Sequence, residues 1–294
     1  MNVDVGCVEI NQENSKKLLN RFKNIKVFSS IEESFKMNYD GYIISTPPKS
    51  HAKIAVQLLT NHKPILIEKP LALSVSECET IKEAIEKYEG KVLVGHLLLF
   101  HPAIVKIKSM IEDGHIGKIQ YIYSNRLNLG QVRKEEDVLW SFAPHDISIF
   151  QYFTGSFPSR MSSVGKDFLQ ENINDICTLH LGYKNGIQGH INVNWMHPFK
   201  EHRLVIIGTK GSFCFEDSNK NKQLLFYEKD FDKSNNSFSL KNKVPKKINF
   251  SKELPLKIEL NYFLKVINGK TVEKIGFKEG FEVIKILEMA SNKG

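Results

Sequence analysis

The sequence predicts a doubly wound α/β domain followed by an α+β domain with a large, mostly antiparallel open sheet. Short apolar strands alternate with helices over residues 1–97, strands dominate from residue 98 onward, and hairpin turns join several of those later strands. Apolar strands that alternate with helices indicate a parallel sheet covered on both faces, whereas consecutive hairpins build an antiparallel one. We therefore expect two domains, residues 1–97 and 98–294.

In the first domain, turn and capping residues separate the expected elements. Ser30 and Ser74 each stand three residues before a Glu, the capping-box pattern that opens a helix, and Ser50 is the expected N-cap of another helix. The expected strands are Val3–Ile10, Lys26–Phe28, Gly41–Ser45, Pro64–Ile67 and Lys91–Gly95. The expected helices are Asn14–Phe22, one that follows Ser30, His51–Thr60, and one that runs from Ser74 to Tyr88.

The second domain is expected to begin with a helix over Pro102–Glu112 and to end with helices over Leu254–Ile267 and Glu279–Met289. The Asn185-Gly186 pair is a strong hairpin signal, and Gly208 to Gly211 forms a similar turn. The expected strands are Ile119–Asn128, Ser159–Val164, Ile176–Tyr183, Ile187–Trp195, His202–Ile207, Ser212–Glu216 and Leu224–Tyr227.

Composition narrows the class of protein. Of 294 residues, 41% are hydrophobic and 25% are charged, which is ordinary for a soluble globular protein. No run of about 18 apolar residues predicts a membrane span, and the first residues lack the basic and apolar segments of a signal peptide. Four widely spaced cysteines without a C-x-x-C pair indicate thiols in a reducing cytoplasm rather than a zinc or redox motif.

The net charge is +8, with a local excess of lysine between Lys220 and Lys252. That stretch is also rich in Asn and Ser, which predicts a solvated loop or an edge hairpin. A nucleic-acid binder is not expected, because the sequence has no recognition motif and no arginine-rich stripe. His197 and His202 are five residues apart around a turn, and no metal site is expected there or elsewhere.

Several motifs lie where a parallel sheet binds ligands, beyond the carboxyl ends of its strands. Thr46-Pro47-Pro48 follows the third expected strand, Glu68-Lys69-Pro70 the fourth, and His96 the fifth. Further along, the segment Trp140–Asp146 reads W-S-F-A-P-H-D. The order and spacing of these motifs resemble the glucose–fructose oxidoreductase / inositol dehydrogenase (Gfo/Idh/MocA) family, and the resemblance covers nearly the whole chain.

The resemblance implies an oxidoreductase that passes hydride between a nicotinamide cofactor and a secondary alcohol or ketone of a sugar, with nucleotide-sugar members as the nearest likeness. It implies catalytic roles for Lys69 and His145. The residues that it implies for cofactor binding are Glu9, Ser45, Thr46, Pro47, Pro48, His51, Glu68, Lys69 and His96. The residues that it implies for substrate binding are Lys69, Arg126, Asn128, Trp140 and His145.

Physical chemistry supports the two catalytic assignments. A lysine in a partly desolvated crevice beside a positively charged ring has a depressed pKa, so Lys69 is suited to orient a hydroxyl or relay its proton. Pro144 suits the first position of a helix, which predicts His145 in the first turn, where the helix N-terminus disfavours imidazolium and leaves a neutral base. The alternative for Lys69 is a surface lysine after a buried strand, and the alternative for His145 is a histidine packed in the domain interface. Asp146, in the same turn as His145, is expected simply to complement the helix dipole.

Arg126 and Asn128 lie two apart on one expected strand and therefore share a face. The resemblance places that face in the substrate cleft, where Arg suits a phosphate or carboxylate and Asn suits sugar hydroxyls. A polar face exposed to solvent is the alternative.

The sequence departs from the family pattern at its start. No G-x-G-x-x-G motif is present, and residues 3–11 fit the family's second strand, so that Glu9 falls where an acidic residue binds the adenosine ribose and favours NAD over NADP. The first strand, central in this fold, and its glycine turn would lie before Met1. Either a start site placed too far downstream or a degraded copy explains this, and the orderly caps and strands favour the former.

A second departure is Ser141, which stands where the family commonly has Asp, four residues before the catalytic His. Serine supplies no negative charge, so Asp137 or Asp146 is the candidate substitute. These two departures leave a second hypothesis open: a non-catalytic binding or assembly protein. The broad open sheet predicts a homo-oligomer, a dimer or tetramer, in either case.

Overall fold

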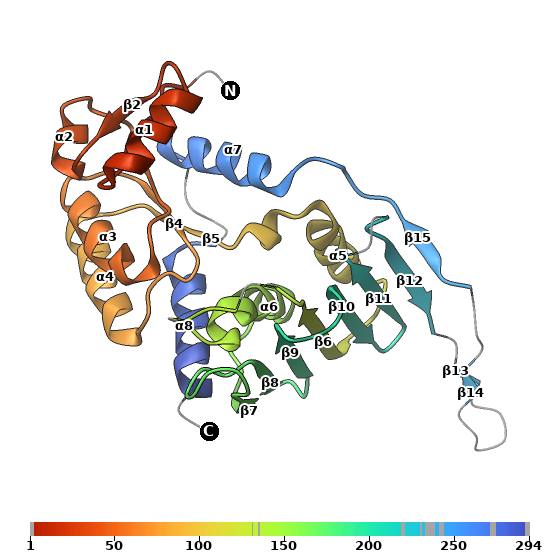
Figure 1. The fold of residues 1–294 in the computed structure, drawn as a ribbon. Coiled ribbons are helices and arrows are strands. Elements are labelled where there is room, and N and C mark those ends of the chain that lie inside the picture. The colour runs from red at the N-terminus through yellow and green to blue at the C-terminus, as the bar shows by residue number, and fades with distance from the viewer. Residues whose placement is uncertain are drawn as a thin grey trace. The chain divides into compact units, whose positions relative to one another are not determined.

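The computed structural model describes residues 3–130, 132–134, 136–218, 221–229, 231–232, 239–240, 244–270 and 275–291. The chain forms two compact units, Met1–Tyr42 and Ile43–Gly294, which are treated separately below (Figure 1). The predicted division at residue 97 is not the boundary of these units and separates two kinds of sheet instead. The parallel β4–β5 pair ends at Gly95, and the first strand of the large sheet begins at Ile119.

The first unit contains one small parallel sheet and two helices. Its elements are β1 (Gly6–Val8), α1 (Gln12–Arg21), β2 (Lys26–Phe28) and α2 (Ile31–Phe35). Asn11 caps α1 by accepting hydrogen bonds from the backbone N–H groups of Glu13 and Asn14. No residue of α1 is buried, and β1 is shorter than the predicted strand.

The second unit begins with a three-stranded sheet in the order β3-β4-β5, in which β4 and β5 run parallel. Its strands are β3 (Tyr42–Ile44), β4 (Ile65–Glu68) and β5 (Val92–Gly95), and its helices are η1 (Pro48–Ser50), α3 (His51–Thr60) and α4 (Val75–Tyr88). Ile65, Leu66 and Ile67 are all buried, as predicted for a sheet covered on both faces. This sheet shares no described strand with the β1–β2 sheet of the first unit.

Ser50 occupies the N-cap position of α3, as expected, but its side chain does not cap the helix. The hydroxyl instead donates to Thr46 Oγ1 at 2.7 Å and to the Pro47 carbonyl at 2.8 Å. The short helix η1 ahead of α3 turns Ser50 back toward the Thr-Pro-Pro turn, so that its hydroxyl stabilises that turn rather than the helix.

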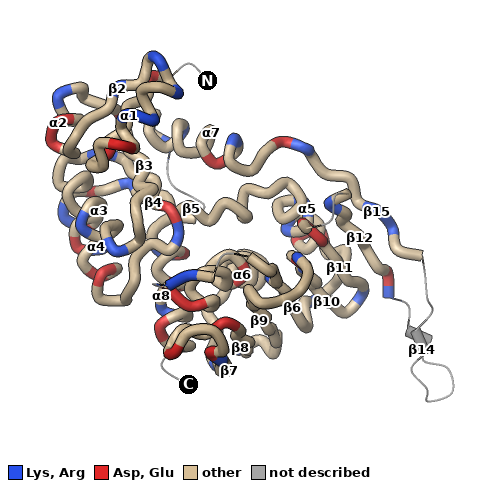
Figure 2. The backbone as a smooth tube through the Cα atoms, in the orientation of Figure 1, with Lys and Arg blue, Asp and Glu red and all other residues tan. Residues whose placement is uncertain are grey.

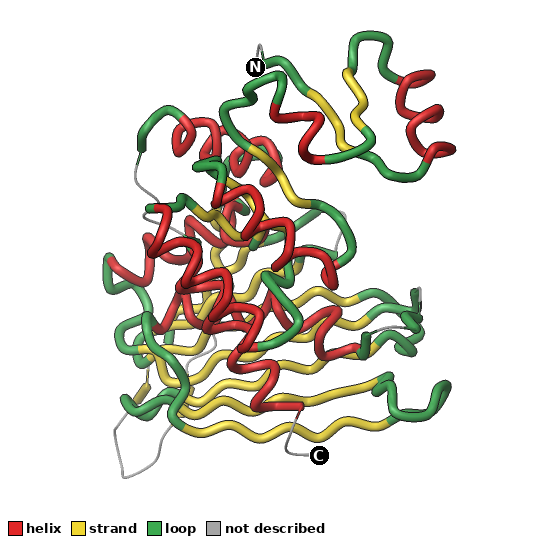
Figure 3. The backbone as a smooth tube through the Cα atoms, turned by 90° about the vertical axis from the view of Figure 1, so that its left-hand side faces the viewer, coloured by secondary structure: helices red, strands yellow, loops and turns green. Residues whose placement is uncertain are grey.

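A large sheet of eight strands, in the order β15-β12-β11-β10-β6-β9-β8-β7, fills the rest of the second unit (Figure 3). The β6–β9 pair is parallel and all other neighbours are antiparallel, as predicted. Its strands are β6 (Ile119–Leu127), β7 (Arg160–Lys166), β8 (Ile176–Gly182), β9 (Gln188–Asn194), β10 (Glu201–Gly208), β11 (Gly211–Glu216), β12 (Leu224–Glu228) and β15 (Lys246–Ile248). The predicted Asn-Gly turn is confirmed, with Gly186 at φ +86 between β8 and β9.

The lysine-rich stretch contains β12, a small β13–β14 pair (Phe231–Asp232 and Ser239–Leu240) and the edge strand β15. Part of this stretch lies outside the described residues. Basic and acidic residues are scattered through the described chain, between longer stretches of other residues (Figure 2). No described helix is both long and apolar enough to cross a membrane.

Five further helices accompany the large sheet: η2 (Leu97–Phe100), α5 (Pro102–Glu112), α6 (Val138–Thr154), α7 (Pro255–Ile267) and α8 (Phe277–Ser291). Helix α6 packs across β6, β8 and β9. A Cβ on Gly189 of β9 would lie 2.8 Å from the Phe150 ring, so glycine there lets α6 approach the sheet closely.

The prediction that this helix begins at Pro144 is wrong. Helix α6 begins at Val138, and the carboxylate of Asp137 caps it by accepting from the Trp140 backbone N–H at 3.0 Å. Pro144 lies within the helix and has no N–H to donate to the Trp140 carbonyl four residues earlier. Because Ala143, Pro144 and Ile147 are buried, packing of the helix against its surroundings outweighs the lost hydrogen bond.

Candidate active site

Lys69 joins the end of β4 to helix α6. Its Nζ donates a hydrogen bond to the Ser141 carbonyl at 3.1 Å, and the Lys69–Pro70 peptide bond is cis. Burial lowers the pKa of the Lys69 ammonium; the charge of Glu136 opposes this shift, and that of Arg126 adds to it. Lys69 therefore gives up its proton more readily than a surface lysine.

His145 lies one helical turn after Ser141 on α6. Burial lowers the pKa of His145 well below its ordinary value, and the positive charges of Arg126 and Lys69 lower it further. Its Nδ1 is buried and has no hydrogen-bond partner among the described residues. The sequence-based reason for a neutral imidazole, a helix N-terminus, is wrong, but desolvation and neighbouring cations favour the same neutral form.

The Thr-Pro-Pro turn follows β3, and Ser45, Thr46 and Pro47 are exposed there. His51, at the start of α3, is 1% exposed and holds this turn to the next one. Its Nε2 lies 2.8 Å from the Thr46 carbonyl, and its Nδ1 lies 2.8 Å from the Pro70 carbonyl. Both ring nitrogens are thus engaged within the protein, so His51 supports the two turns from beneath.

His96 ends β5 and is also 1% exposed. Neither of its ring nitrogens has a hydrogen-bond partner in the described part of the chain. Burial, followed by the charge of Lys69, lowers the pKa of His96 to about 4. Two unsatisfied nitrogens on a buried ring are costly unless another group completes their hydrogen bonds, which makes His96 a candidate contact for a bound molecule.

Glu68 is the last residue of β4. A Cβ on Gly95 would lie 3.1 Å from Glu68 Oε2, so the glycine leaves room for this carboxylate. On α7, Glu259 is 1% exposed and its Oε1 has no described partner. Burial, with a contribution from the charge of Glu68, raises the pKa of Glu259 to about 7. Sequence reasoning missed Glu259, although it stands among apolar residues in the predicted C-terminal helix.

Arg126 is committed to Asp146. Its Nε donates to Asp146 Oδ2 at 2.7 Å and its Nη2 donates to Oδ1 at 3.1 Å, while the two side chains are only 11% and 4% exposed. Asp146 therefore neutralises Arg126, and its predicted role at a helix N-terminus is wrong. Asn128 lies just beyond β6, which ends at Leu127, and its backbone N–H donates to the Asn194 carbonyl.

Trp140, the other predicted substrate contact, has a hydrogen-bond partner within the protein. So do Asp137 and Asp146, the expected substitutes for the missing carboxylate. The indole N–H of Trp140 donates to Ser291 Oγ at 2.9 Å. Asp137 caps α6 and Asp146 binds Arg126, while Ser141 itself is buried. The family pattern has a carboxylate four residues before the histidine. On α6 no unpaired carboxylate takes its place.

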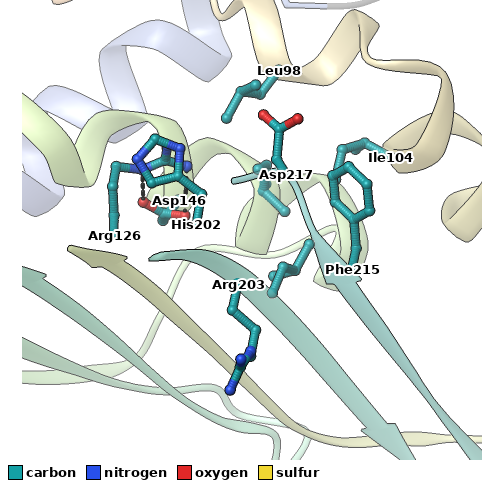
Figure 4. A pocket seen from close by; sticks show the side chains of 10 residues that line it. Leu98, Ile104, Arg126, Asp146, His202, Arg203, Phe215 and Asp217 are labelled. Atoms are coloured by element: carbon teal, nitrogen blue, oxygen red, sulfur yellow. Dashed lines mark hydrogen bonds and ion pairs between the residues drawn. The ribbon is translucent and has the colours of Figure 1, made fainter. Parts of the chain in front are cut away.

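A partly open hollow lies beside Arg126 and Asp146 (Figure 4). Its wall is formed by side chains of both kinds: apolar Leu98, Ile104, Ile149, Leu204 and Phe215, and polar Arg126, Asp146, His202, Arg203 and Asp217. Arg126 and His202 are directly opposite each other on β6 and β10, and the Asp217 backbone N–H donates to the His202 carbonyl at 2.9 Å. The three side chains thus form a row across neighbouring strands.

Sequence reasoning considered His202 only as a weak metal ligand and did not single out Asp217. A signal was present, because strand alternation places His202 on the same face as the buried Leu204 and Ile206. Among the described residues, no group of three or more His, Cys, Asp or Glu is arranged to hold a metal ion.

In the first unit, Glu9 follows β1 directly. Its backbone N–H donates to the Phe28 carbonyl at 3.0 Å, and its Oε1 accepts from the Asn11 backbone N–H at 2.8 Å. The carboxylate therefore stands at the carboxyl end of a parallel strand, just before the cap of α1.

Two family models match most of the chain. Residues 4–96 match the model described as an oxidoreductase family with an NAD-binding Rossmann fold, and residues 104–214 match the GFO/IDH/MocA C-terminal domain. Residues 97–103 lie between the two matched segments.

Individual relatives are more distant. The chain is 23% identical over 227 residues to 2,7-anhydro-N-acetylneuraminate hydratase of Escherichia coli, covering 72% of this chain and 60% of that protein. It is 26% identical over 184 residues to scyllo-inositol 2-dehydrogenase (NAD(+)) of Bacillus subtilis, covering 59% and 54%. The matched part thus spans slightly more than half the length of these relatives.

Among solved structures, UDP-N-acetylglucosamine 3-dehydrogenase of Acidithiobacillus ferrooxidans has a similar fold. The TM-score is 0.83 at 18% identity, covering 98% of this chain and 96% of that one.

Proposed function

The chain belongs to the Gfo/Idh/MocA family of oxidoreductases, and on that premise we propose that it serves NAD-dependent hydride transfer at a secondary alcohol or ketone of a sugar or nucleotide sugar. The observation that carries this proposal is the Lys69–Ser141 hydrogen bond. It joins the turn after β4 to the helix that bears His145, and so brings an ammonium group into the electrostatic range of that imidazole.

The two groups are suited to move one proton. His145 is neutral near pH 7, because burial and neighbouring cations lower its pKa, and a neutral imidazole accepts the proton of a substrate hydroxyl. Lys69 donates hydrogen bonds and, with its lowered pKa, also exchanges a proton with that hydroxyl. In the reverse direction the same groups return the proton to a carbonyl oxygen.

The cofactor supplies the hydride acceptor or donor when it is bound. The residues of the second unit fit its nicotinamide end: exposed Ser45, Thr46 and Pro47 with half-buried Pro48, half-buried Glu68, and His96 with its two unsatisfied nitrogens. His51 acts indirectly by holding the turns. No glycine-rich phosphate loop occurs in the 294 residues, so we assign no residue to the pyrophosphate.

We infer a preference for NAD over NADP from Glu9, whose carboxylate would repel a 2′-phosphate. A sugar substrate is supported by the names of the similar proteins, which include an inositol dehydrogenase and a nucleotide-sugar dehydrogenase. We place the chain in the cytoplasm on the grounds of its four widely spaced cysteines.

A homo-oligomer formed through the large sheet is part of the proposal. The sheet face opposite α6 carries half-buried aromatic and aliphatic side chains, among them Tyr121, Tyr123 and Val205. A second copy would cover this face, because contiguous apolar surface on a sheet is stabilised by burial.

The test measures NADH binding and turnover separately. Fluorescence titration is carried out on the chain as it stands and on a fusion that carries a glycine-rich βα unit ahead of residue 1. We expect the fusion to bind NADH, and Lys69→Ala in it to lower kcat at least about 100-fold while changing NADH affinity less than about three-fold. Lys53→Ala, an exposed lysine on α3, is the matched control.

The second hypothesis, a non-catalytic binding or assembly protein, is favoured by Ser141 and by the missing glycine motif. If neither protein binds NADH, the enzymatic proposal is wrong and this hypothesis replaces it. Equal losses of turnover and NADH affinity in Lys69→Ala would reject the catalytic role of Lys69 alone.

A further inference from the structure

Two histidines face each other across the strands β8 and β9. His180 and His190 are directly opposite in the antiparallel register, and their ring centres lie 5.8 Å apart. A Cβ on Gly189 would point at the Phe150 ring of α6, so the next residue, His190, faces the other side of the large sheet, and His180 does too. His180 is exposed and His190 is half-buried. The pair therefore lies on the sheet face away from α6.

Two tyrosines of β6 fix the ring of His190. Its Nδ1 shares a hydrogen bond with the Tyr121 hydroxyl. Tyr123, directly opposite on β6, stacks on the same ring, with centres 5.3 Å apart and an angle of 11° between the planes. Because Nδ1 is engaged, Nε2 is the ring nitrogen left for another group. A hydrogen bond to the second nitrogen is also what orients histidines that bind metal ions.

The ring of His180 is free to complete a site with His190. It makes no hydrogen bond to the described residues, and its ring contact is with His190. Two imidazoles that bind one zinc ion through nitrogens at about 2.0–2.1 Å have their ring centres roughly 5–6 Å apart. The observed separation of 5.8 Å lies in this range, so the pair needs only a small rotation of the exposed ring.

From this geometry we propose that His180 and His190, which we name the cross-strand histidine pair, bind one divalent transition-metal ion such as Zn²⁺ through one nitrogen of each ring, with water in the remaining positions. The described residues hold no group of three or more His, Cys, Asp or Glu arranged for a metal, so the ion has two protein ligands. The proposal goes beyond the proposed function and does not depend on it. It departs from the sequence-based expectation that the chain has no metal site.

The neighbours of the pair select the class of ion. Ser162 is directly opposite His180 on β7. The residues two positions along β8 and β9 share the same face and carry no charge: Thr178, Gly182, Gln188 and Asn192. Mg²⁺ and Ca²⁺ prefer carboxylate and other oxygen ligands, whereas neutral imidazoles suit Zn²⁺, Ni²⁺ and Cu²⁺. Because none of these neighbours supplies a carboxylate, the pair favours the second group of ions.

The experiment is a titration of the full chain with zinc chloride by calorimetry, with histidine ring signals followed by NMR and Mg²⁺ as the comparison ion. We expect saturable, micromolar binding of one Zn²⁺ per chain, with the ring signals of His180 and His190 shifting together. Mg²⁺ should bind at least about 100-fold more weakly. A second copy is proposed to cover this face, so the titration is repeated at lower chain concentration. The affinity should not fall on dilution, because both ligands belong to one chain.

Variants test which side chains bind the ion. His180→Gln and His190→Gln should each weaken Zn²⁺ at least about ten-fold, because each leaves a single imidazole. His115→Gln, the same change at an exposed turn, is the matched control and should not weaken it. Cys214→Ser, which removes the thiol on the same sheet face, should not weaken it either. Tyr121→Phe keeps the His190 ring but releases its orientation, and should weaken Zn²⁺ about ten-fold.

The absence of saturable Zn²⁺ binding by the unchanged chain would overturn the cross-strand histidine pair. Binding that survives in both His→Gln variants, that is lost on dilution, or that Mg²⁺ matches in affinity would overturn it as well. His180→Gln decides the question alone if His190→Gln does not fold, because His180 is exposed. The NADH titration is scored separately, so a chain or fusion that binds NADH but no Zn²⁺ would reject the pair and leave the proposed function standing.

Discussion

The two units of the chain are stabilised in different ways. Among the described residues of the first unit, no hydrophobic side chain is buried; Ser34 is its single buried residue. The second unit buries large side chains completely, among them Trp195, Phe150 and Phe213. Burial of apolar area is the main source of folding free energy, so the second unit is expected to carry most of the stability of the molecule.

This difference bears on the residues that are proposed to contact the cofactor, which are described here unit by unit. Glu9, the candidate for the adenosine ribose, stands in the unit that lacks a core of its own, where caps and edge-on ring contacts such as Phe28–Tyr39 provide much of the order. Lys69, His96 and His145 stand in the unit with the large core. The residues proposed to handle the proton are therefore pre-positioned by packing, whereas the residue proposed to bind the ribose relies on local hydrogen bonds.

The largest expected effect of this difference is on amide hydrogen exchange. Exchange in β4 and β5 should be at least about 1000-fold slower than in β1 and β2, because the former requires opening of the packed second unit and the latter only local opening. Mass spectrometry of peptides that cover residues 6–28 and 65–95 measures both. Equal protection in the two segments would mean that the units unfold together, and it would contradict the claim that the second unit is the more stable one.

Much of the second unit was predictable because its elements carry local signals. The strands β4 and β5 and the helices α3 and α4 lie within a residue or two of their predicted bounds, since buried apolar residues mark all four elements and a capping serine, Ser74, marks α4. The motifs predicted that Lys69 and His145 act together, which stays a prediction, and the structure shows that Lys69 donates a hydrogen bond to Ser141 on the helix that bears His145. The separate compactness of the first 42 residues has no comparable local signal.

What escaped prediction depends on contacts distant in sequence. Pro144 is accommodated inside α6 by buried neighbours, which a local rule for proline does not include. The row of Arg126, His202 and Asp217 exists because β10 pairs with β6, more than seventy residues earlier in the chain. Such a register cannot be derived from either strand alone, because each fixes only which residues share a face.

The second expected effect is on how the stability of the two units depends on pH. The burial that stabilises the second unit raises the pKa of Glu259 to about 7. Between the unfolded value, about 4.5, and about 7, the unfolded chain releases a proton that the folded chain keeps, so stability falls as pH rises through this window. Glu259→Gln removes this dependence and should be about 2 kcal/mol more stable than the unchanged chain at pH 8, with no difference near pH 4.5.

Glu33 in the first unit is the matched control with the opposite sign. Hydrogen bonds from the backbone N–H and hydroxyl of Ser29 lower the pKa of this exposed carboxyl. Its contribution to stability is therefore present above its unfolded pKa and is lost as pH falls. Chemical denaturation of both Gln variants from about pH 3 to 8 measures the difference. A Glu259→Gln variant that loses stability at pH 8 would show that the carboxylate is stabilising.

The smallest expected effect comes from one substitution made in both units. Ser30 and Ser74 accept from the backbone N–H groups of Glu33 and Glu77 at 3.2 and 3.1 Å. In both boxes the glutamate accepts from the residue before the serine, at 2.9 Å from Ser29 and 2.8 Å from Leu73. The two caps are thus matched in chemistry and geometry, and only the unit around them differs.

Loss of either serine hydroxyl should cost about 1 kcal/mol locally. Ser74→Ala should lower the main Tm by about 2–4 °C, because α4 belongs to the cooperative core of the second unit. Ser30→Ala should leave that Tm within about 1 °C and speed amide exchange in α2 about five-fold, since the first unit opens without the second. Equal Tm losses would show that the first unit, despite its missing core, is part of the same folding transition, and the cause of its stability would then have to lie outside its own residues.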